Sequence, residues 1–144
     1  MNECNLDFSQ YKIKKTKNRM DIYNVLDHSD IPLNANEIDI ILKKDNIFID
    51  LSTIYRVLKV FEEKGIVRKA LEDTDKSVMY ELAKNRHKHY LLCNSCNGLE
   101  EVNMCPLENM REKIEEERGF LVDYHNLTIR GTCKNCLKKE AFNN

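Results

Sequence analysis

The chain has 144 residues, of which 42% are apolar and 33% are charged, and its formal net charge is −1. This length allows one domain or two very small ones, and the apolar fraction is sufficient to fill a core. The nearly neutral balance excludes a global attraction to nucleic acid or to an anionic membrane, so any nucleic-acid surface must be a local patch. No stretch is long and apolar enough to span a membrane, and the polar start MNECNLDFSQ is unlike a signal peptide. We therefore expect a cytoplasmic protein without membrane partners.

The first half of the sequence is predicted to fold as three helices followed by a hairpin. Apolar residues recur at helical spacing from Lys17 to about His28, after residue 34, and from residue 52 until Gly65 ends the third helix. The predicted N-terminal caps are Thr16, Asn34 (with Glu37 completing a capping box) and Ser52. Residues 66–67 and 78–80 then flank a polar stretch, as the strands of a hairpin do. This order is typical of a winged helix-turn-helix.

The second half is predicted to be a small α/β domain. We expect a strand over residues 90–93, a helix from Pro106 to Arg118 that ends at Gly119, and a strand over residues 121–130. So small an open sheet exposes an edge, where a second copy can pair. The fold class is therefore α+β, with an N-terminal winged helix-turn-helix domain and a small C-terminal α/β dimerisation domain.

The distribution of cysteine and histidine sets the expected domain boundary. All of these residues follow Ala83 except Cys4 and His28. We predict domains at residues 1–83 and 84–144, with a hinge around residues 83–86. In a cytoplasmic chain, six cysteines favour metal binding over disulfides.

Two Cys-x-x-Cys pairs, Cys93 with Cys96 and Cys133 with Cys136, carry the clearest chemical signal. Each turn holds two sulfur atoms on one side of a tight loop, where both can bind one tetrahedral Zn²⁺. Two such turns complete a four-thiolate site without an open position, which is typical of structural zinc. Free buried thiols or a redox pair are the alternatives.

A second cluster begins with His87 and His89. On a strand, residues i and i+2 share a face, so both imidazoles can reach one ion. Glu108 and His125 are candidates for two further ligands, and such a set suits Zn²⁺ without excluding Fe²⁺. The alternative is a solvated pair and an unrelated core histidine.

Basic and polar side chains mark a candidate DNA-binding surface. A recognition helix presents its N-terminal residues to base edges, while nearby lysines and arginines contact phosphates. Acidic residues slightly outnumber basic ones over residues 1–83, which argues against tight non-specific binding and leaves a solvated charged surface as the alternative. The residues predicted to contact double-stranded DNA are Lys14, Lys15, Arg19, Ser52, Thr53, Tyr55, Arg56 and Lys69.

Together these residues resemble the ferric uptake regulator family of bacterial metal-responsive repressors, over nearly the whole chain from residue 14 to 136. The segments that carry the resemblance are Lys15-Thr16-x-x-Arg19, Ala35-x-Glu37-Ile38, Leu51-Ser-Thr-Ile-Tyr-Arg56-Val-Leu, Gly65-Ile-Val, Tyr80-Glu81-Leu82, His87-x-His89-x-x-x-Cys93-x-x-Cys96 and Cys133-x-x-Cys136. The resemblance implies a homodimer that closes onto a pseudo-palindromic operator when metal binds. It also implies structural zinc at the four cysteines and a regulatory ion at His87, His89, Glu108 and His125.

The resemblance implies a further metal site at the hinge, from which this sequence departs. The corresponding positions are Leu33, Glu81, Lys88, Tyr90 and Glu101, so only the two carboxylates remain as ligands. We expect this degenerate site not to hold a transition metal at family strength, which argues against the peroxide-sensing branch. Lys88 can instead place a permanent cation beside Glu81 or Glu101.

Two features favour the zinc uptake regulator branch over the iron-sensing one. Cys105-Pro106 resembles a dipeptide of some zinc uptake regulators, and His89 stands where iron sensors often have Asp. A thiol without any ligand role is an equal reading of Cys105. We predict a repressor that senses zinc, with iron as the alternative, and controls metal uptake genes.

Two other functions are alternatives to a repressor. In a zinc hydrolase, His87, His89 and His125 would hold a catalytic ion and Glu108 would be the general base. A thiol- or peroxide-sensing regulator would use Cys4, Cys105 or the paired cysteines. We predict no catalytic residues, because no separate nucleophile or oxyanion motif is visible and a hydrolase gives the winged helix no task.

Overall fold

The structure is a computed structural model that describes residues 4–71, 78–85, 88–102, 104–123 and 125–142. The chain divides into two compact units, Met1–Asn85 (unit 1) and Arg86–Asn144 (unit 2). No helix in the described part of the chain is long and apolar enough to cross a membrane.

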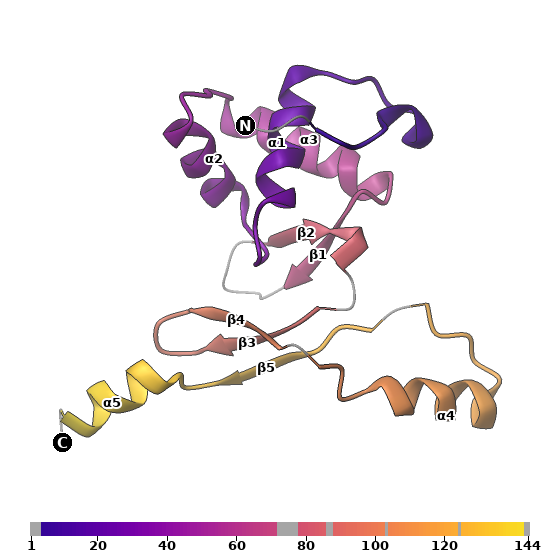
Figure 1. Cartoon of the computed structure of the whole chain (residues 1–144), viewed down its shortest axis with the longest axis vertical. Helices are drawn as coiled ribbons and strands as arrows, with labels where there is room; N and C mark the ends of the chain where they lie inside the picture. The colour runs from indigo at the N-terminus through magenta and orange to yellow at the C-terminus, as the bar shows by residue number, and fades with distance from the viewer. Residues whose placement is uncertain (1–3, 72–77, 86–87, 103, 124, 143–144) are drawn as a thin grey trace. The chain divides into compact units, whose positions relative to one another are not determined.

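Unit 1 packs three helices against a two-stranded hairpin (Figure 1). Its elements are the 3-10 helix η1 (Phe8–Tyr11), α1 (Lys17–Asp27), α2 (Ala35–Lys44), α3 (Leu51–Glu63), β1 (Val67–Leu71), β2 (Met79–Leu82) and the 3-10 helix η2 (Ala83–Asn85). The core forms because each helix turns an apolar stripe inward, with Ile22, Ile38, Ile54, Leu58 and Phe61 fully buried. This is the winged helix-turn-helix that the sequence predicts.

The helix ends follow the predicted caps in two of three cases. The Thr16 hydroxyl accepts a hydrogen bond from the Arg19 backbone N–H at 3.2 Å, and the Asn34 side chain accepts one from the Glu37 N–H at 2.8 Å. The prediction that Ser52 caps the third helix is wrong. That helix begins two residues earlier than this cap implies, at Leu51 after Asp50, so the Ser52 side chain lies in its exposed first turn.

The wing is an antiparallel hairpin in which Val67 faces Leu82 and Arg68 faces Glu81. The predicted polar stretch between its strands, residues 72–77, lies outside the described residues. Leu33 extends the sheet by bridging Tyr80 through two backbone hydrogen bonds of 2.8 and 2.9 Å. This bridge ties the segment before α2 to the wing.

Unit 2 is built on a three-stranded sheet in the order β4-β3-β5, with β3 antiparallel to β4 and parallel to β5. Its elements are β3 (His89–Cys93), β4 (Leu99–Val102), α4 (Glu108–Arg118), β5 (Thr128–Gly131) and α5 (Lys134–Phe142). The strand, helix and strand of a small α/β domain are therefore present. Both β4 and α5 are additions that the sequence analysis missed.

Two predicted boundaries in unit 2 are wrong. The helix begins at Glu108 rather than at Pro106, which lies in the preceding turn. The strand predicted over residues 121–130 is regular only from Thr128, because β3 has just five residues and its pairing with β5 starts at Tyr90 opposite Thr128. As a result, His125 lies in an irregular segment and not on a strand.

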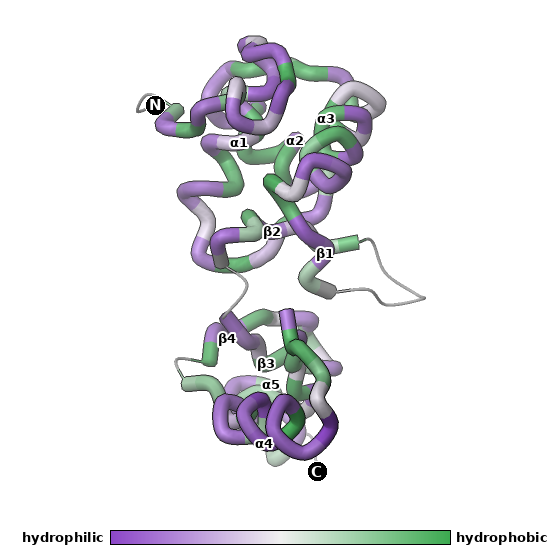
Figure 2. Tube along the Cα trace, turned by 90° about the vertical axis from the view of Figure 1, so that its right-hand side faces the viewer, coloured by the Kyte–Doolittle hydropathy of each residue, from purple (hydrophilic) through white to green (hydrophobic). Residues whose placement is uncertain are grey.

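Unit 2 buries little apolar surface of its own. The buried apolar residues among its described positions are Tyr90, Leu92, Cys93 and Cys136. None of the side chains of α4 is buried, and Figure 2 shows this helix as mostly hydrophilic. Large apolar side chains such as Phe120, Leu121 and Ile129 are instead exposed. A unit with so small a core needs stabilisation from bound ions or from a partner surface.

Candidate metal centres and DNA-binding surface

The four paired cysteines come together at one end of the unit 2 sheet. Cys93 ends β3, Cys96 lies in the following turn, and Cys133 and Cys136 lie just before and within α5. All four sulfur atoms lie within 4.8 Å of one another, and the Sγ atoms of Cys96 and Cys133 are 3.8 Å apart. With zinc–sulfur bonds of 2.3 Å, the edge of a tetrahedral site is also about 3.8 Å. The Cys96–Cys133 separation therefore matches one edge of a zinc site, and all four sulfur atoms are close enough to share one ion.

Backbone groups hold two of these sulfur atoms in place. The Cys133 N–H donates to the Cys93 sulfur at 3.3 Å, and the Gly98 N–H donates to the Cys96 sulfur at 3.4 Å. Gly98 also lacks a side chain where one would interfere, because a Cβ there would lie 3.2 Å from the Cys96 sulfur. This turn is shaped around the sulfur atom.

The thiol pKa values of this cluster are spread apart. The backbone N–H of Cys133 lowers the pKa of Cys93 to about 6, because hydrogen bonds stabilise the thiolate. The hydrogen bond with Cys133, together with burial, raises the pKa of Cys136 to about 12. A divalent cation bound to all four sulfur atoms would lower each thiol pKa, because it favours the thiolate form of every ligand. All six cysteines of the chain are free thiols.

A second cluster in unit 2 brings together His89, Cys105 and His125. The two imidazole Nε2 atoms are 3.1 Å apart, and the Cys105 sulfur lies 3.3 Å from that of His89 and 3.1 Å from that of His125. The rings of the two histidines stack with centroids 4.9 Å apart. His89 is 1% exposed, whereas Cys105 and His125 are half-buried, and the three side chains bring one ligand-type atom each to the same place.

This cluster differs from the predicted regulatory set in one ligand. His89 and His125 are together as expected, whereas Glu108 is exposed at the start of α4 and is not a member of the group. Cys105 joins the histidines instead. His87, the remaining predicted ligand, lies outside the described residues.

The two carboxylates of the degenerate hinge site are each paired with a cation of their own unit. Glu81 forms a salt bridge with Arg68, and its side chain is 4% exposed. Glu101 lies 3.7 Å from the Lys88 ammonium, which is the cation that the sequence suggested. Sequence analysis did not assign Arg68 to Glu81, although the wing register places the two residues opposite each other.

The exposed face of α3 presents most of the predicted base-reading residues. Ile54, Val57 and Leu58 turn into the core, so Ser52, Tyr55 and Arg56 face outward while Thr53 is half-buried. The buried and the exposed residues lie on opposite faces of α3 because their spacing follows the helical repeat of 3.6 residues. An exposed polar N-terminal half on this helix is what a recognition helix requires.

The predicted phosphate contacts are less uniform. Lys14 and Lys15 are exposed before α1. Arg19 is half-buried and donates to the Lys14 carbonyl at 2.6 Å, and Lys69 lies 3.8 Å from a Glu62 carboxylate oxygen. Arg19 therefore fixes the backbone that carries the lysines.

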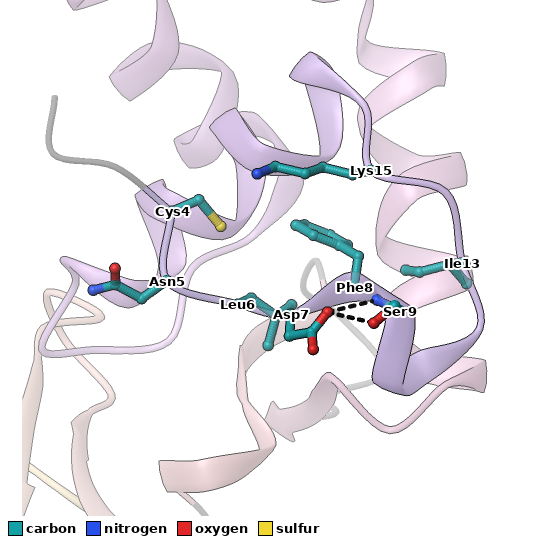
Figure 3. Close-up of a pocket in the computed structure, with 8 residues that line it drawn as sticks. All are labelled: Cys4, Asn5, Leu6, Asp7, Phe8, Ser9, Ile13 and Lys15. Carbon is teal, nitrogen blue, oxygen red and sulfur yellow. Dashed lines mark hydrogen bonds between the residues drawn. The ribbon is translucent and has the colours of Figure 1, made fainter.

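Lys15 also stands at the rim of a pocket of about 390 Å³ formed by the N-terminal segment (Figure 3). Inside it, the Asp7 carboxylate accepts hydrogen bonds from the Ser9 backbone N–H at 3.1 Å and from its hydroxyl at 2.6 Å. Cys4 lines the same pocket and packs against the unit 1 core. This placement gives Cys4 a packing role.

Comparisons with known proteins agree with this architecture. Residues 10–130 match the model of the ferric uptake regulator family. A ferric uptake regulation protein of Bordetella parapertussis is 33% identical over 127 residues, which cover 88% of this chain and 91% of that protein. The solved structure of the Vibrio cholerae ferric uptake regulator is 26% identical, covers 88% of this chain and 96% of that one, and superposes with a TM-score of 0.75. The Francisella tularensis regulator, solved with iron, is 29% identical, covers 87% and 95%, and has a TM-score of 0.70.

Proposed function

The chain belongs to the ferric uptake regulator family, and from this premise we propose that it is a homodimeric repressor that binds a pseudo-palindromic operator when a metal ion occupies unit 2. Proteins of this family are metal-responsive transcriptional regulators and not enzymes, so the hydrolase alternative is wrong. The genes under control are those for metal uptake, and the protein works in the cytoplasm, where operator DNA is found.

The observation that best supports DNA binding is the exposed face of α3. Tyr55 is 46% exposed, Arg56 is exposed beside it, and neither has a structural task in the core. Arginine can bind a guanine edge through two hydrogen bonds, and an aromatic ring can contact a thymine methyl group. Lys14 and Lys15 are placed before α1 to contact phosphates and so fix the register on the duplex.

Replacing one base-reading residue tests this assignment. Arg56→Ala is expected to weaken binding to an operator, selected from random double-stranded DNA by the wild-type protein, by roughly 1–3 kcal/mol. Arg118→Ala is the matched control, because it removes the same charge from an exposed position at the end of α4. Fluorescence anisotropy measures both. Equal operator affinity in the two variants would contradict the recognition-helix assignment.

The free edge of the unit 2 sheet supports the homodimer. β5 has a strand partner on one side only within the described sheet, so its other edge can pair with a second copy. Leu91 and Ile129, which are opposite each other in the β3–β5 register, are 38% and 47% exposed. A partner copy would cover these apolar side chains.

The metal response is assigned to His87, His89, Glu108 and His125, with zinc or iron as the ion, and structural zinc is assigned to the four cysteines. The converging imidazoles of His89 and His125 support the first site, and the tetrahedral spacing of the sulfur atoms supports the second. Glu81 and Glu101 have protein cations beside them, so we infer that the degenerate hinge site is not the regulatory one. An ion that binds the closed form better than the open one increases DNA affinity by that difference.

A further inference from the structure

We propose that the Cys105 thiolate is a direct ligand of the regulatory ion, in the place assigned to Glu108, and that it makes this site selective for zinc. The inference rests on the proposed function, because it names the ion and a ligand of the same site. His89 belongs to β3, Cys105 precedes α4, and His125 follows it. Three separate segments therefore deliver one donor atom each to a common point.

The distances among the three atoms fit an ion at that point. With zinc–nitrogen bonds of 2.0–2.1 Å and a zinc–sulfur bond of 2.3 Å, the edges of a tetrahedral site are about 3.3 Å between nitrogens and about 3.5 Å between nitrogen and sulfur. The observed separations are 3.1 Å for the two nitrogens and 3.1 and 3.3 Å for the sulfur contacts. Shifts of a few tenths of an ångström complete three corners of the site.

Hydrogen bonding among the three side chains is a poorer account of the same arrangement. Three atoms that all lie within hydrogen-bond distance of one another cannot each donate and accept along every edge, because a neutral imidazole has one N–H and a thiol has one S–H. A central cation satisfies all three lone pairs together.

The identity of the third ligand decides which metal the site prefers. Imidazole accepts zinc, iron and copper, whereas a carboxylate suits harder ions such as Mn²⁺, and a thiolate favours softer ones such as Zn²⁺. Glu108 would supply an oxygen, but its exposed position on α4 leaves it outside the group. Cys105 supplies a sulfur, so the site favours zinc over iron and manganese.

Cobalt provides a probe that reports on the thiolate directly. The zinc of the four-cysteine site is left in place in the full-length protein, and Co²⁺ is added to the second site. We expect a near-ultraviolet cobalt–sulfur charge-transfer absorption in the wild type and in Cys4→Ser, the matched control, but not in Cys105→Ser. The same absorption in Cys105→Ser would overturn the proposal.

Operator binding under buffered metal gives the second readout. Loss of an outer-shell partner costs a metal site 10–100-fold in affinity, so Cys105→Ser is expected to raise the free zinc concentration for half-maximal DNA binding by at least about tenfold. Cys105→Asp is expected to retain a metal response and to shift its preference toward Mn²⁺ and Fe²⁺. An unchanged zinc response in both variants would contradict the inference alone, whereas a wild type that ignores every metal would contradict the proposed function.

Discussion

The interiors of the two units of this chain are built from different kinds of residue. Unit 1 encloses a continuous cluster of aliphatic and aromatic side chains drawn from η1, α1, α2, α3 and both strands of the wing. In unit 2 the buried positions include two cysteines of the four-thiolate cluster and one histidine of the second cluster. The core of unit 1 is therefore built from apolar side chains, whereas the interior of unit 2 includes residues that are candidate metal ligands.

The largest expected effect is the collapse of unit 2 without its four-cysteine ion. In Cys136→Ser, a buried ligand is lost, so the zinc should be released and the amides of β3 and β5 should lose hydrogen-exchange protection. The helices of unit 1 should keep their protection, because their core contains no ligand. Cys4→Ser is the control and should retain its zinc. A Cys136→Ser protein with full zinc and a protected sheet would refute this difference.

A substitution that creates a cavity in the core of unit 1 should destabilise unit 1 and leave the zinc of unit 2 in place. Leu58 is fully buried on α3, so Leu58→Ala should lower the free energy of unfolding of unit 1 by about 2–5 kcal/mol. Lys59→Ala, at the exposed neighbouring position, should change it little. Zinc content, measured by elemental analysis, should stay the same in both variants. Loss of zinc in Leu58→Ala would mean that the two units are not independent.

A smaller effect is expected where the backbone supports a sulfur atom. The Cβ of Gly98→Ala would lie 3.2 Å from the Cys96 sulfur, so that ligand must move and zinc affinity should fall by about tenfold. Gly131→Ala is the control in the same unit, because its Cβ would meet nothing within 4 Å. Competition with a chelator measures both. Equal affinities would show that the turn tolerates the displacement.

The smallest effect concerns protons released by zinc. At about pH 7.5, Cys93, with its pKa lowered to about 6, is already a thiolate, whereas Cys136, with its pKa raised to about 12, must give up its proton. Zinc binding should therefore release fewer than four protons, and one more below about pH 6, where Cys93 becomes protonated. Calorimetry in buffers of different ionisation enthalpy counts these protons. A count that is independent of pH would contradict the assignment.

The sequence predicted unit 1 more completely than unit 2, for a local reason. Helix periodicity and the caps at Thr16 and Asn34 depend on residues three or four positions apart, so they can be recognised from the sequence without knowledge of the fold. By contrast, β4 carries two exposed glutamates and α5 is mostly polar, so neither has an apolar pattern. Their positions depend on pairing with β3 and on the cysteine cluster.

The candidate sites divide in the same way. The Cys-x-x-Cys pairs are local motifs, so the sequence alone identified that cluster. The group of His89, Cys105 and His125 joins residues from three segments, and no spacing rule links Cys105 to either histidine. The family resemblance suggested Glu108 as the partner of these histidines, whereas the structure places Cys105 beside them. Only the tertiary structure shows which of the two residues lies near the imidazoles.

The central claim is that an ion at the histidine cluster of unit 2 controls DNA binding by unit 1. The most direct test measures operator affinity of the wild type, His125→Ala and the control His28→Gln across buffered zinc concentrations, with the four-cysteine zinc retained. We predict that zinc strengthens operator binding of the wild type and of His28→Gln by about 5–150-fold, which corresponds to a coupling of 1–3 kcal/mol. We also predict that His125→Ala shows no such response. A full response in His125→Ala would contradict the account.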